Sequence, residues 1–321
     1  MSFTGRPGCV FFRSFSLGVA LAGCTAAPEH TVAPRLEPAL SRAATWTAWS
    51  TALPLSELNT PGATEGCPAV VRSGQVLYFA SNRPGGYGAL DLYVSSWDAA
   101  AKRWGPAVNL GPEINTAANE QCPLVLQNGR QLVFVSNRPG GVGGLDLWIT
   151  RQPDLRDPFR WETPTNLTAA NSPQDDFGPG AYEDNGRTVL YFNSNRPGGA
   201  GQHDLYVSTE QRDGAWSGAI AAPGLNTVVQ EQFPALTRDG LEIVFASDRP
   251  GTLGGLDLWH ATRASTAAPW GTPVNLGPLV NSPAAEGRSS ISWDGTTLIF
   301  HSNRAGSVDL FETSRARAAR R

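Results

Sequence analysis

The chain has 321 residues, of which 40% are hydrophobic and 17% are charged, and its formal net charge is −3. This hydrophobic fraction is sufficient for a folded core, and the slight acidity argues against a nucleic-acid-binding protein, which needs a basic surface. The 35 glycines and 25 prolines have no collagen period and recur at matching positions, so we interpret them as turn residues rather than as a sign of disorder.

The first 23 residues have the pattern of an export signal. Arg6 and Arg13 supply positive charge, and the apolar stretch 15–22 is too short to span a bilayer. The segment ends in Leu-Ala-Gly-Cys at residues 21–24, which resembles the lipobox of bacterial lipoproteins. That resemblance implies cleavage before Cys24, acylation of Cys24 and a place in the bacterial cell envelope, with the outer membrane favoured because Thr25 follows. An ordinary secretory signal is the alternative.

Residues 24–45 predict a lipidated tether. They are rich in alanine and proline and show no hydrophobic period, so we expect them to link the anchor to the folded body. The lipid would then be the protein's only contact with the membrane. The folded body is expected over residues 46–313, followed by a basic, solvated tail over 314–321 whose sharper interpretation is contact with anionic lipid or wall polymer.

One sequence pattern recurs five times in the folded body. Its serines stand at positions 81, 136, 194, 247 and 302, with separations of 55, 58, 53 and 55 residues. Each serine is followed by Asn or Asp and then by Arg, and in four copies by Pro-Gly. A fixed period of this length indicates a repeat architecture.

The copy over residues 120–171 predicts four short strands. An apolar run at 120–126 ends at Asn128-Gly129, which is a strong hairpin signal. Further strands are predicted over 131–136, 145–150 and 161–167, and Asn171 closes the unit. Four strands per copy at this period are typical of propeller blades.

The phase of the repeat predicts how the ring closes. Residues 49–59 match the end of a copy but precede the first one, and the last copy stops after its third strand. We therefore expect an all-β, monomeric propeller of five four-stranded blades, in which the N-terminal segment supplies the fourth strand of the last blade.

The pattern resembles the WD40-like, TolB-type propeller repeat (PD40) of bacterial envelope proteins. Residues 231–259 carry it in the form Glu231, Pro234, Asp239-Gly240, Phe245, Ser247, Arg249 and Asp257-Leu258-Trp259. The resemblance spans about residues 49–312 and implies a non-enzymatic platform without a cofactor, which binds an envelope protein, a peptidoglycan-associated partner or a cell-wall component. The chain departs from TolB in lacking the N-terminal α/β domain, in its lipobox and in its five rather than six blades.

The hairpin turns predict that several polar residues gather on one face. A two-residue turn at 128–129 would set Glu120 opposite Asn137. One functional interpretation is an acidic binding face that attracts a cation or a basic segment of a partner. Its candidate residues are Glu65, Glu120, Asp175, Asp176, Glu231, Asp248 and Glu286. Asp248 is expected to face Glu231, which makes this pair a candidate cation site, although no set of six oxygen ligands is apparent.

The structural interpretation is a clamp in each blade. A loop arginine would grip both the first-strand acid and the third-strand aspartate. The arginine–aspartate pairs are Arg83/Asp91, Arg138/Asp146, Arg196/Asp204, Arg249/Asp257 and Arg304/Asp309. Because framework residues share the repeat symmetry, we favour the clamp and expect function where the copies differ: at Asp248, Asp175, Gln202-His203 and the shortened loop 305–307.

Two alternatives to a binding platform stay open. One is a glycosidase-like propeller hydrolase with asymmetrically placed carboxylates, for which Asp175 is the extra acid, and the other is a lectin-like sugar binder. No catalytic residue is predicted, because the four histidines lie in no motif and no Gly-x-Ser-x-Gly sequence occurs. Cys67 and Cys122 occupy the same slot of two copies, and either a disulfide or two free thiols are compatible with that placement.

Overall fold

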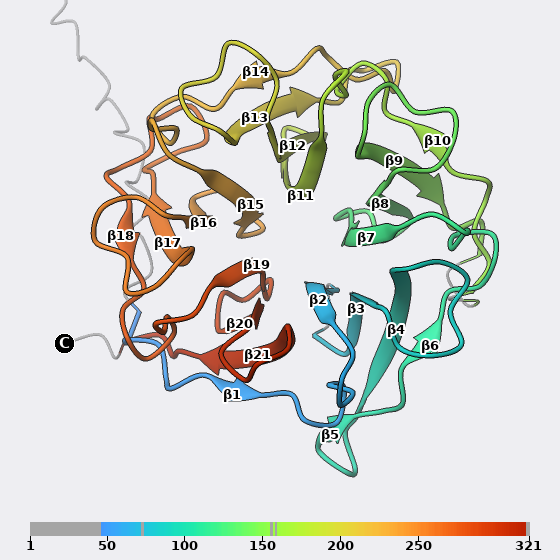
Figure 1. Cartoon of the computed structure of the whole chain (residues 1–321). Helices are drawn as coiled ribbons and strands as arrows, with labels where there is room; N and C mark the ends of the chain where they lie inside the picture. Colours follow the sequence, from blue (N-terminus) through green and yellow to red (C-terminus); the bar gives the residue numbers. More distant parts are fainter. Residues whose placement is uncertain (1–45, 72–73, 155–156, 158, 319–321) are drawn as a thin grey trace, which may run out of the picture. The chain divides into compact units, whose positions relative to one another are not determined.

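The computed structural model describes residues 46–318 except 72–73, 155–156 and 158. This part of the chain folds into five four-stranded antiparallel sheets arranged as the blades of a β-propeller (Figure 1), so the predicted fold is confirmed. Within the described ranges every named element is a strand, and none of the chain there forms a helix that could cross a membrane.

Each blade takes its strands from one repeat copy. Blade 1 is β2 (Glu65–Val70), β3 (Val76–Ser81), β4 (Asp91–Asp98) and β6 (Val108–Asn109), with the short strand β5 (Arg103–Trp104) paired antiparallel with the end of β4. Blade 2 is β7 (Glu120–Val125), β8 (Gln131–Ser136), β9 (Asp146–Arg151) and β10 (Thr165–Asn166). Blade 3 is β11 (Asp176–Asp184), β12 (Arg187–Ser194), β13 (Asp204–Thr209) and β14 (Ile220–Ala221). Blade 4 is β15 (Glu231–Leu236), β16 (Glu242–Ser247), β17 (Asp257–Thr262) and β18 (Val274–Asn275). Blade 5 is β19 (Glu286–Ile291), β20 (Thr297–Ser302), β21 (Asp309–Ser314) and β1 (Leu53–Pro54).

The N-terminal segment closes the ring as predicted. β1 pairs antiparallel with β21, Leu53 opposite Glu312, and so becomes the fourth strand of blade 5. The fourth strands are only two residues long, shorter than the predicted strand 161–167, because Trp161 lies before β10 and packs into the core instead.

The register of the innermost strands differs from the prediction by one residue. Glu120 lies opposite Ser136 rather than Asn137, and the register shifts between Gln121 and Leu124. The cause is a β-bulge at Cys122, whose φ is +48°, followed by a proline that cannot donate a ladder hydrogen bond. The innermost strands of the other four blades contain the same shift.

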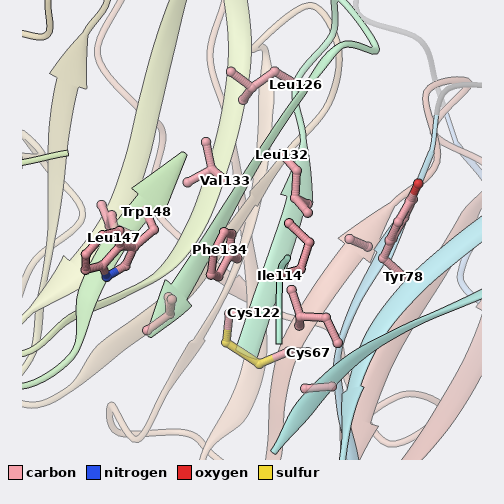
Figure 2. Packing of buried hydrophobic residues seen from close by; sticks show 14 of the residues in the cluster. Cys67, Tyr78, Ile114, Cys122, Leu126, Leu132, Val133, Phe134, Leu147 and Trp148 are labelled. Atoms are coloured by element: carbon pink, nitrogen blue, oxygen red, sulfur yellow. A yellow bond between two sulfur atoms is a disulfide. The ribbon is translucent and has the colours of Figure 1, made fainter. Parts of the chain in front are cut away.

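The core lies between the blades and is built from matching positions of the repeat. The central phenylalanine of each second strand is fully buried: Phe79, Phe134, Phe192, Phe245 and Phe300. Figure 2 shows Phe134 among the surrounding aliphatic side chains near Cys122. Burial of each such ring contributes roughly 1.5–3 kcal/mol to folding, which explains why the position is constant.

A disulfide joins the innermost strands of blades 1 and 2. Cys67 of β2 and Cys122 of β7 are bonded, with their Cα atoms 4.5 Å apart, and Figure 2 shows the bridge beside the core. The bulge turns both side chains toward the neighbouring strand, because both cysteines have positive φ. The structure therefore selects the disulfide over the two free thiols.

The start of the basic tail is part of the folded body. Arg315 was expected to be solvated, but its side chain is only 4% exposed and contacts Glu242 of the neighbouring blade through two hydrogen bonds of 2.9 and 2.6 Å. Its guanidinium also lies over the rings of Trp46 and Trp49. The expectation of a solvated arginine fails because two aromatic rings and a buried carboxylate offer it a better environment than water.

Candidate functional site

The first-strand acids do not form an open acidic ring. Each carboxylate is 0% exposed and is paired with the arginine of its own blade: Glu65 with Arg83 at 3.1 Å, Glu120 with Arg138 at 3.1 Å, Asp176 with Arg196 at 2.5 Å, Glu231 with Arg249 at 3.0 Å and Glu286 with Arg304 at 2.9 Å. These five acids are therefore neutralised and inaccessible to a ligand. They belong to the framework.

Blade 2 shows how the framework is held. Glu120 accepts hydrogen bonds from the Ser136 hydroxyl at 2.8 Å and from the Thr116 amide at 2.7 Å. Arg138 donates to the Ser136 hydroxyl and to the Ile114 carbonyl, and its plane lies over the Phe134 ring, 4.9 Å from the ring centre. Burial lowers the pKa of Arg138, while Glu120 opposes that shift. Such a satisfied, stacked ion pair joins two strands rather than binding a ligand.

The third-strand aspartate has a different partner from the one expected. Asp146 accepts hydrogen bonds from the amides of Val142 and Gly143 and from the Asn166 side chain, and among the described ion pairs none joins a loop arginine to such an aspartate. The clamp thus grips the first strand but not the third. The aspartate instead holds the glycine-rich loop, and a Cβ on Gly141 would lie 2.1 Å from its Oδ2, which explains the glycine there.

The copies differ most at two positions around the propeller axis. These positions follow the buried acid on each innermost strand, and in Figure 1 the five innermost strands surround the axis. The first position holds Gly66, Gln121, Phe177, Gln232 and Gly287, and the second holds Cys67, Cys122, Gly178, Phe233 and Arg288. Function that breaks the repeat symmetry is therefore expected at the axis. The sequence analysis did not include Phe177, Phe233 and Arg288 among the site residues, although the variation at these two positions is a signal that could have found them.

A row of aromatic rings crosses from blade 3 to blade 5 near the axis. His203 packs edge-on against Phe177 at 5.3 Å, Phe177 against Phe233 at 5.6 Å, and Phe233 against His301 at 5.8 Å between ring centres. Burial, with the charge of Arg288, lowers the pKa of His301 to about 4, so that this ring is neutral near pH 7 and can accept a hydrogen bond from the Cys67 amide. The row forms an apolar wall.

Asp175 lies at the blade 3 end of this wall. Its Oδ1 accepts a hydrogen bond of 2.8 Å from the Leu145 amide, and its own amide donates to Asn195. Burial lowers the pKa of His203, and the negative charges of Asp175 and Asp204 oppose that shift, which places Asp175 near the imidazole. Asp175 is partly exposed.

Asp248 lies in blade 4, directly after β16. Its Oδ1 accepts from the Gln230 amide at 2.9 Å, as the asparagine of every other blade does for the corresponding residue, and its Oδ2 lies 3.4 Å from the Gln230 side-chain nitrogen. Gln230 in turn accepts from Gln232 on the innermost strand. A parallel bridge joins Gln230 to His203, so the acids of blades 3 and 4 flank one continuous group of residues.

The expected cation pair is not formed. The bulge sets Glu231 opposite Ser247, and its carboxylate is bound to Arg249 instead of facing Asp248. In the described ranges no group of three or more His, Cys, Asp or Glu side chains is arranged to hold a metal ion. We therefore define the candidate site as Asp175, Phe177, His203, Gln230, Gln232, Phe233 and Asp248.

Comparisons with known proteins identify solved propeller structures with a similar fold. No protein-family model matches the sequence, and no curated protein sequence is similar to it. A thermostable family-43 glycoside hydrolase matches with a TM-score of 0.55 and 13% identity over 82% of this chain and 93% of its own. An endo-arabinase from Bacteroides thetaiotaomicron matches with a TM-score of 0.56 and 16% identity over 83% and 97% of the two chains.

TolB-type propellers are also among the structural neighbours, as the repeat resemblance implied. The one from Agrobacterium tumefaciens matches with a TM-score of 0.47 and 13% identity over 80% of this chain and 78% of its own. At these identities the likeness shows the fold alone. The expectation of a non-enzymatic protein is contradicted, because the neighbours that match with TM-scores above 0.5 include several glycoside hydrolases.

Proposed function

We propose that the protein is a carbohydrate-active enzyme that cleaves a glycosidic bond at the candidate site, with Asp175 and Asp248 as the acid and base. The observation that carries this proposal is the position of these two acids. Both are partly exposed, Asp175 near His203 and Asp248 bonded to Gln230, whereas the five framework acids are buried in ion pairs. The structural neighbours that act on arabinose-containing glycans support the choice of substrate class.

The residues between the two acids suit a sugar. The rings of Phe177 and Phe233 offer an apolar surface to the C–H face of a pyranose or furanose, and the amides of Gln230 and Gln232 can hydrogen-bond its hydroxyls. Glycoside hydrolysis needs one carboxylic acid to protonate the leaving oxygen and one carboxylate to activate water or attack the anomeric carbon. Asp175 and Asp248 are the pair that this geometry offers for those roles.

The test is hydrolysis of a panel of arabinans, xylans and peptidoglycan by the full chain and its variants. We expect D175N and D248N each to lower kcat/KM by at least about 100-fold, the scale of a lost general acid or base. D248N separates a loss of activity from a loss of folding, since it introduces the asparagine found in the other four blades and should fold normally. The control is D213N, in an exposed loop. Full activity in both site variants, or no hydrolysis by the unaltered protein, would contradict the proposal.

We also propose that the enzyme is lipidated at Cys24 and held in the bacterial envelope, with the outer membrane favoured. The lipobox-like sequence supports this, and residues 1–45 lie outside the described residues. The substrate would then be a wall or extracellular glycan, and an envelope protein is the partner that a pull-down would seek. Mass spectrometry of the mature N-terminus provides the test: an unmodified Cys24, or a C24A variant that fractionates like the unaltered protein, speaks against the anchor.

A further inference from the structure

A cavity lies on the propeller axis, at the face that carries the turns between first and second strands. Its volume is about 50 Å³, and all five innermost strands line it, through Val70, Leu124, Ala181, Leu236 and Ile291. Since a water molecule needs roughly 10–15 Å³ measured in this way, the cavity has room for a few waters or for one small oxyanion. We call it the axial pocket.

Arg288 lies at the base of the axial pocket. It belongs to β19, is 2% exposed, and extends across the axis to donate to the carbonyls of Pro234 in blade 4 at 3.4 Å and Pro123 in blade 2 at 3.3 Å. Its Nε has no acceptor among the described residues. A guanidinium has five N–H donors, so these two long hydrogen bonds leave most of its capacity unused.

No carboxylate balances this charge among the described ion pairs. The other buried arginines have acidic partners: Arg249 pairs with Glu231, and Arg315 pairs with Glu242. Arg288 occurs in none of the described ion pairs. Burial accordingly lowers the pKa of Arg288 to about 9, with no anion to offset the effect. A buried charge without a partner is unfavourable unless something else binds it.

The rest of the axial pocket is cationic at its rim and apolar at its walls. Arg238 lines the rim, exposed, with its guanidinium over the Trp293 ring at 4.7 Å. Ser289 also lines the pocket, and its hydroxyl has no partner among the described residues. No acidic residue is among the lining residues, so the field favours an anion.

We propose that the axial pocket binds a carboxylate carried on a small apolar group, with the carboxylate on Arg288 and the apolar group against Leu124 and Leu236. The planar guanidinium matches a carboxylate through two parallel hydrogen bonds, and Ser289 can donate a third. This site is separate from the proposed catalytic site and does not depend on it. Arg238 at the rim attracts the anion and adds selectivity for charge.

Isothermal titration calorimetry on the full chain tests the proposal with matched small probes. We expect propanoate to bind with a Kd below about 1 mM, and its neutral analogue propanamide and inorganic phosphate to bind at least 10-fold more weakly. Equal affinity for the amide would show that Arg288 does not recognise charge. Equal affinity for phosphate would show that the apolar walls do not contribute. Either result, or no binding of the carboxylate, overturns the proposal.

Variants locate the binding. R288Q should abolish carboxylate binding, and A181L, which fills the pocket without touching the arginine, should weaken it at least 10-fold. A99L, in an exposed hairpin, is the matched control and should bind normally. R238Q should weaken binding about 2- to 5-fold and reduce its dependence on salt. If R288Q does not fold, A181L and R238Q decide, and unchanged affinity in both would refute the assignment.

Discussion

The side-chain amide of Asn59 makes two hydrogen bonds with the backbone of Leu310. The Leu310 amide donates to Asn59 Oδ1 at 2.8 Å, and Asn59 Nδ2 donates to the Leu310 carbonyl at 3.0 Å. The same contact recurs at every blade junction, as Asn115–Leu92, Asn171–Leu147, Asn226–Leu205 and Asn281–Leu258. Only at Asn59 are the partners 251 residues apart, so this asparagine joins the two ends of the ring.

The first prediction follows from that contact. N59A removes both hydrogen bonds and leaves the buried Leu310 N–H without this acceptor, which costs about 1–3 kcal/mol, whereas the Leu310 carbonyl still accepts from the Leu55 amide. It also loosens β1, the strand that closes the ring. The free energy of unfolding, measured with urea, should therefore fall more in N59A than in N226A, which loses the same two hydrogen bonds between partners 21 residues apart. Equal losses would mean that the closure of the ring adds nothing to the free energy of unfolding.

The second prediction concerns the framework pair Arg138–Glu120. R138L removes the cation that pairs with the Glu120 carboxylate, which is 0% exposed. Breaking a buried pair in this way costs about 3–5 kcal/mol. Urea unfolding should show this loss. R138L/E120Q should recover part of it, because the double variant no longer buries an unpaired charge. A double variant as unstable as R138L, or an R138L variant of normal stability, would argue against the clamp.

The sequence predicted most of the fold because the fold is periodic. Features such as Phe134, the Asn128-Gly129 turn and Asn171 recur once in every copy. Their number predicts five blades, and the point at which the first and last copies begin and end predicts the closing strand. The register failed by one residue at Cys122, because a bulge with positive φ depends on how the neighbouring strand packs and has no signature in a pattern of hydrophobic residues.

The candidate site was predicted less completely. Asp175 and Asp248 were noticed as departures from the repeat, and the structure brings both to the group around His203. Arg288 was not predicted as a site residue, since its extension across the axis to blades 2 and 4 joins residues 165 and 54 positions apart. Repeat symmetry predicts what the blades share, whereas contacts across the axis depend on the whole ring.

The third prediction concerns the disulfide. Cys67 and Cys122 are 55 residues apart, and a crosslink of that span restricts the unfolded chain enough to contribute about 2–4 kcal/mol. C67A/C122A should lower the urea midpoint by the corresponding amount. Reducing agent should destabilise the unaltered protein and leave the double variant unchanged. If reducing agent affected both proteins equally, its effect would not come from this disulfide.

The last prediction concerns pH and the pair Glu242–Arg315 between blades 4 and 5. Burial raises the pKa of Glu242, but the contacts with His260 and Arg315 outweigh burial and lower it below its usual 4.5. An acid whose pKa is lowered by folding stabilises the protein above the unfolded pKa and loses that contribution as the pH falls through the folded one. The contribution should therefore be full at pH 7 and decline below about pH 4.5.

E242Q tests this dependence directly. At pH 7 the variant leaves Arg315, whose side chain is 4% exposed, without its anion and should lower the free energy of unfolding by about 3 kcal/mol. The difference between the two proteins should narrow as the pH is lowered from 5 to 3, because protonation then removes the same charge from the unaltered protein. E183Q, at an exposed position, is the control and should differ little from the unaltered protein at any pH. A difference for E242Q that stays constant across this range would show that the buried side chain stabilises the blade interface by its shape and not by its charge.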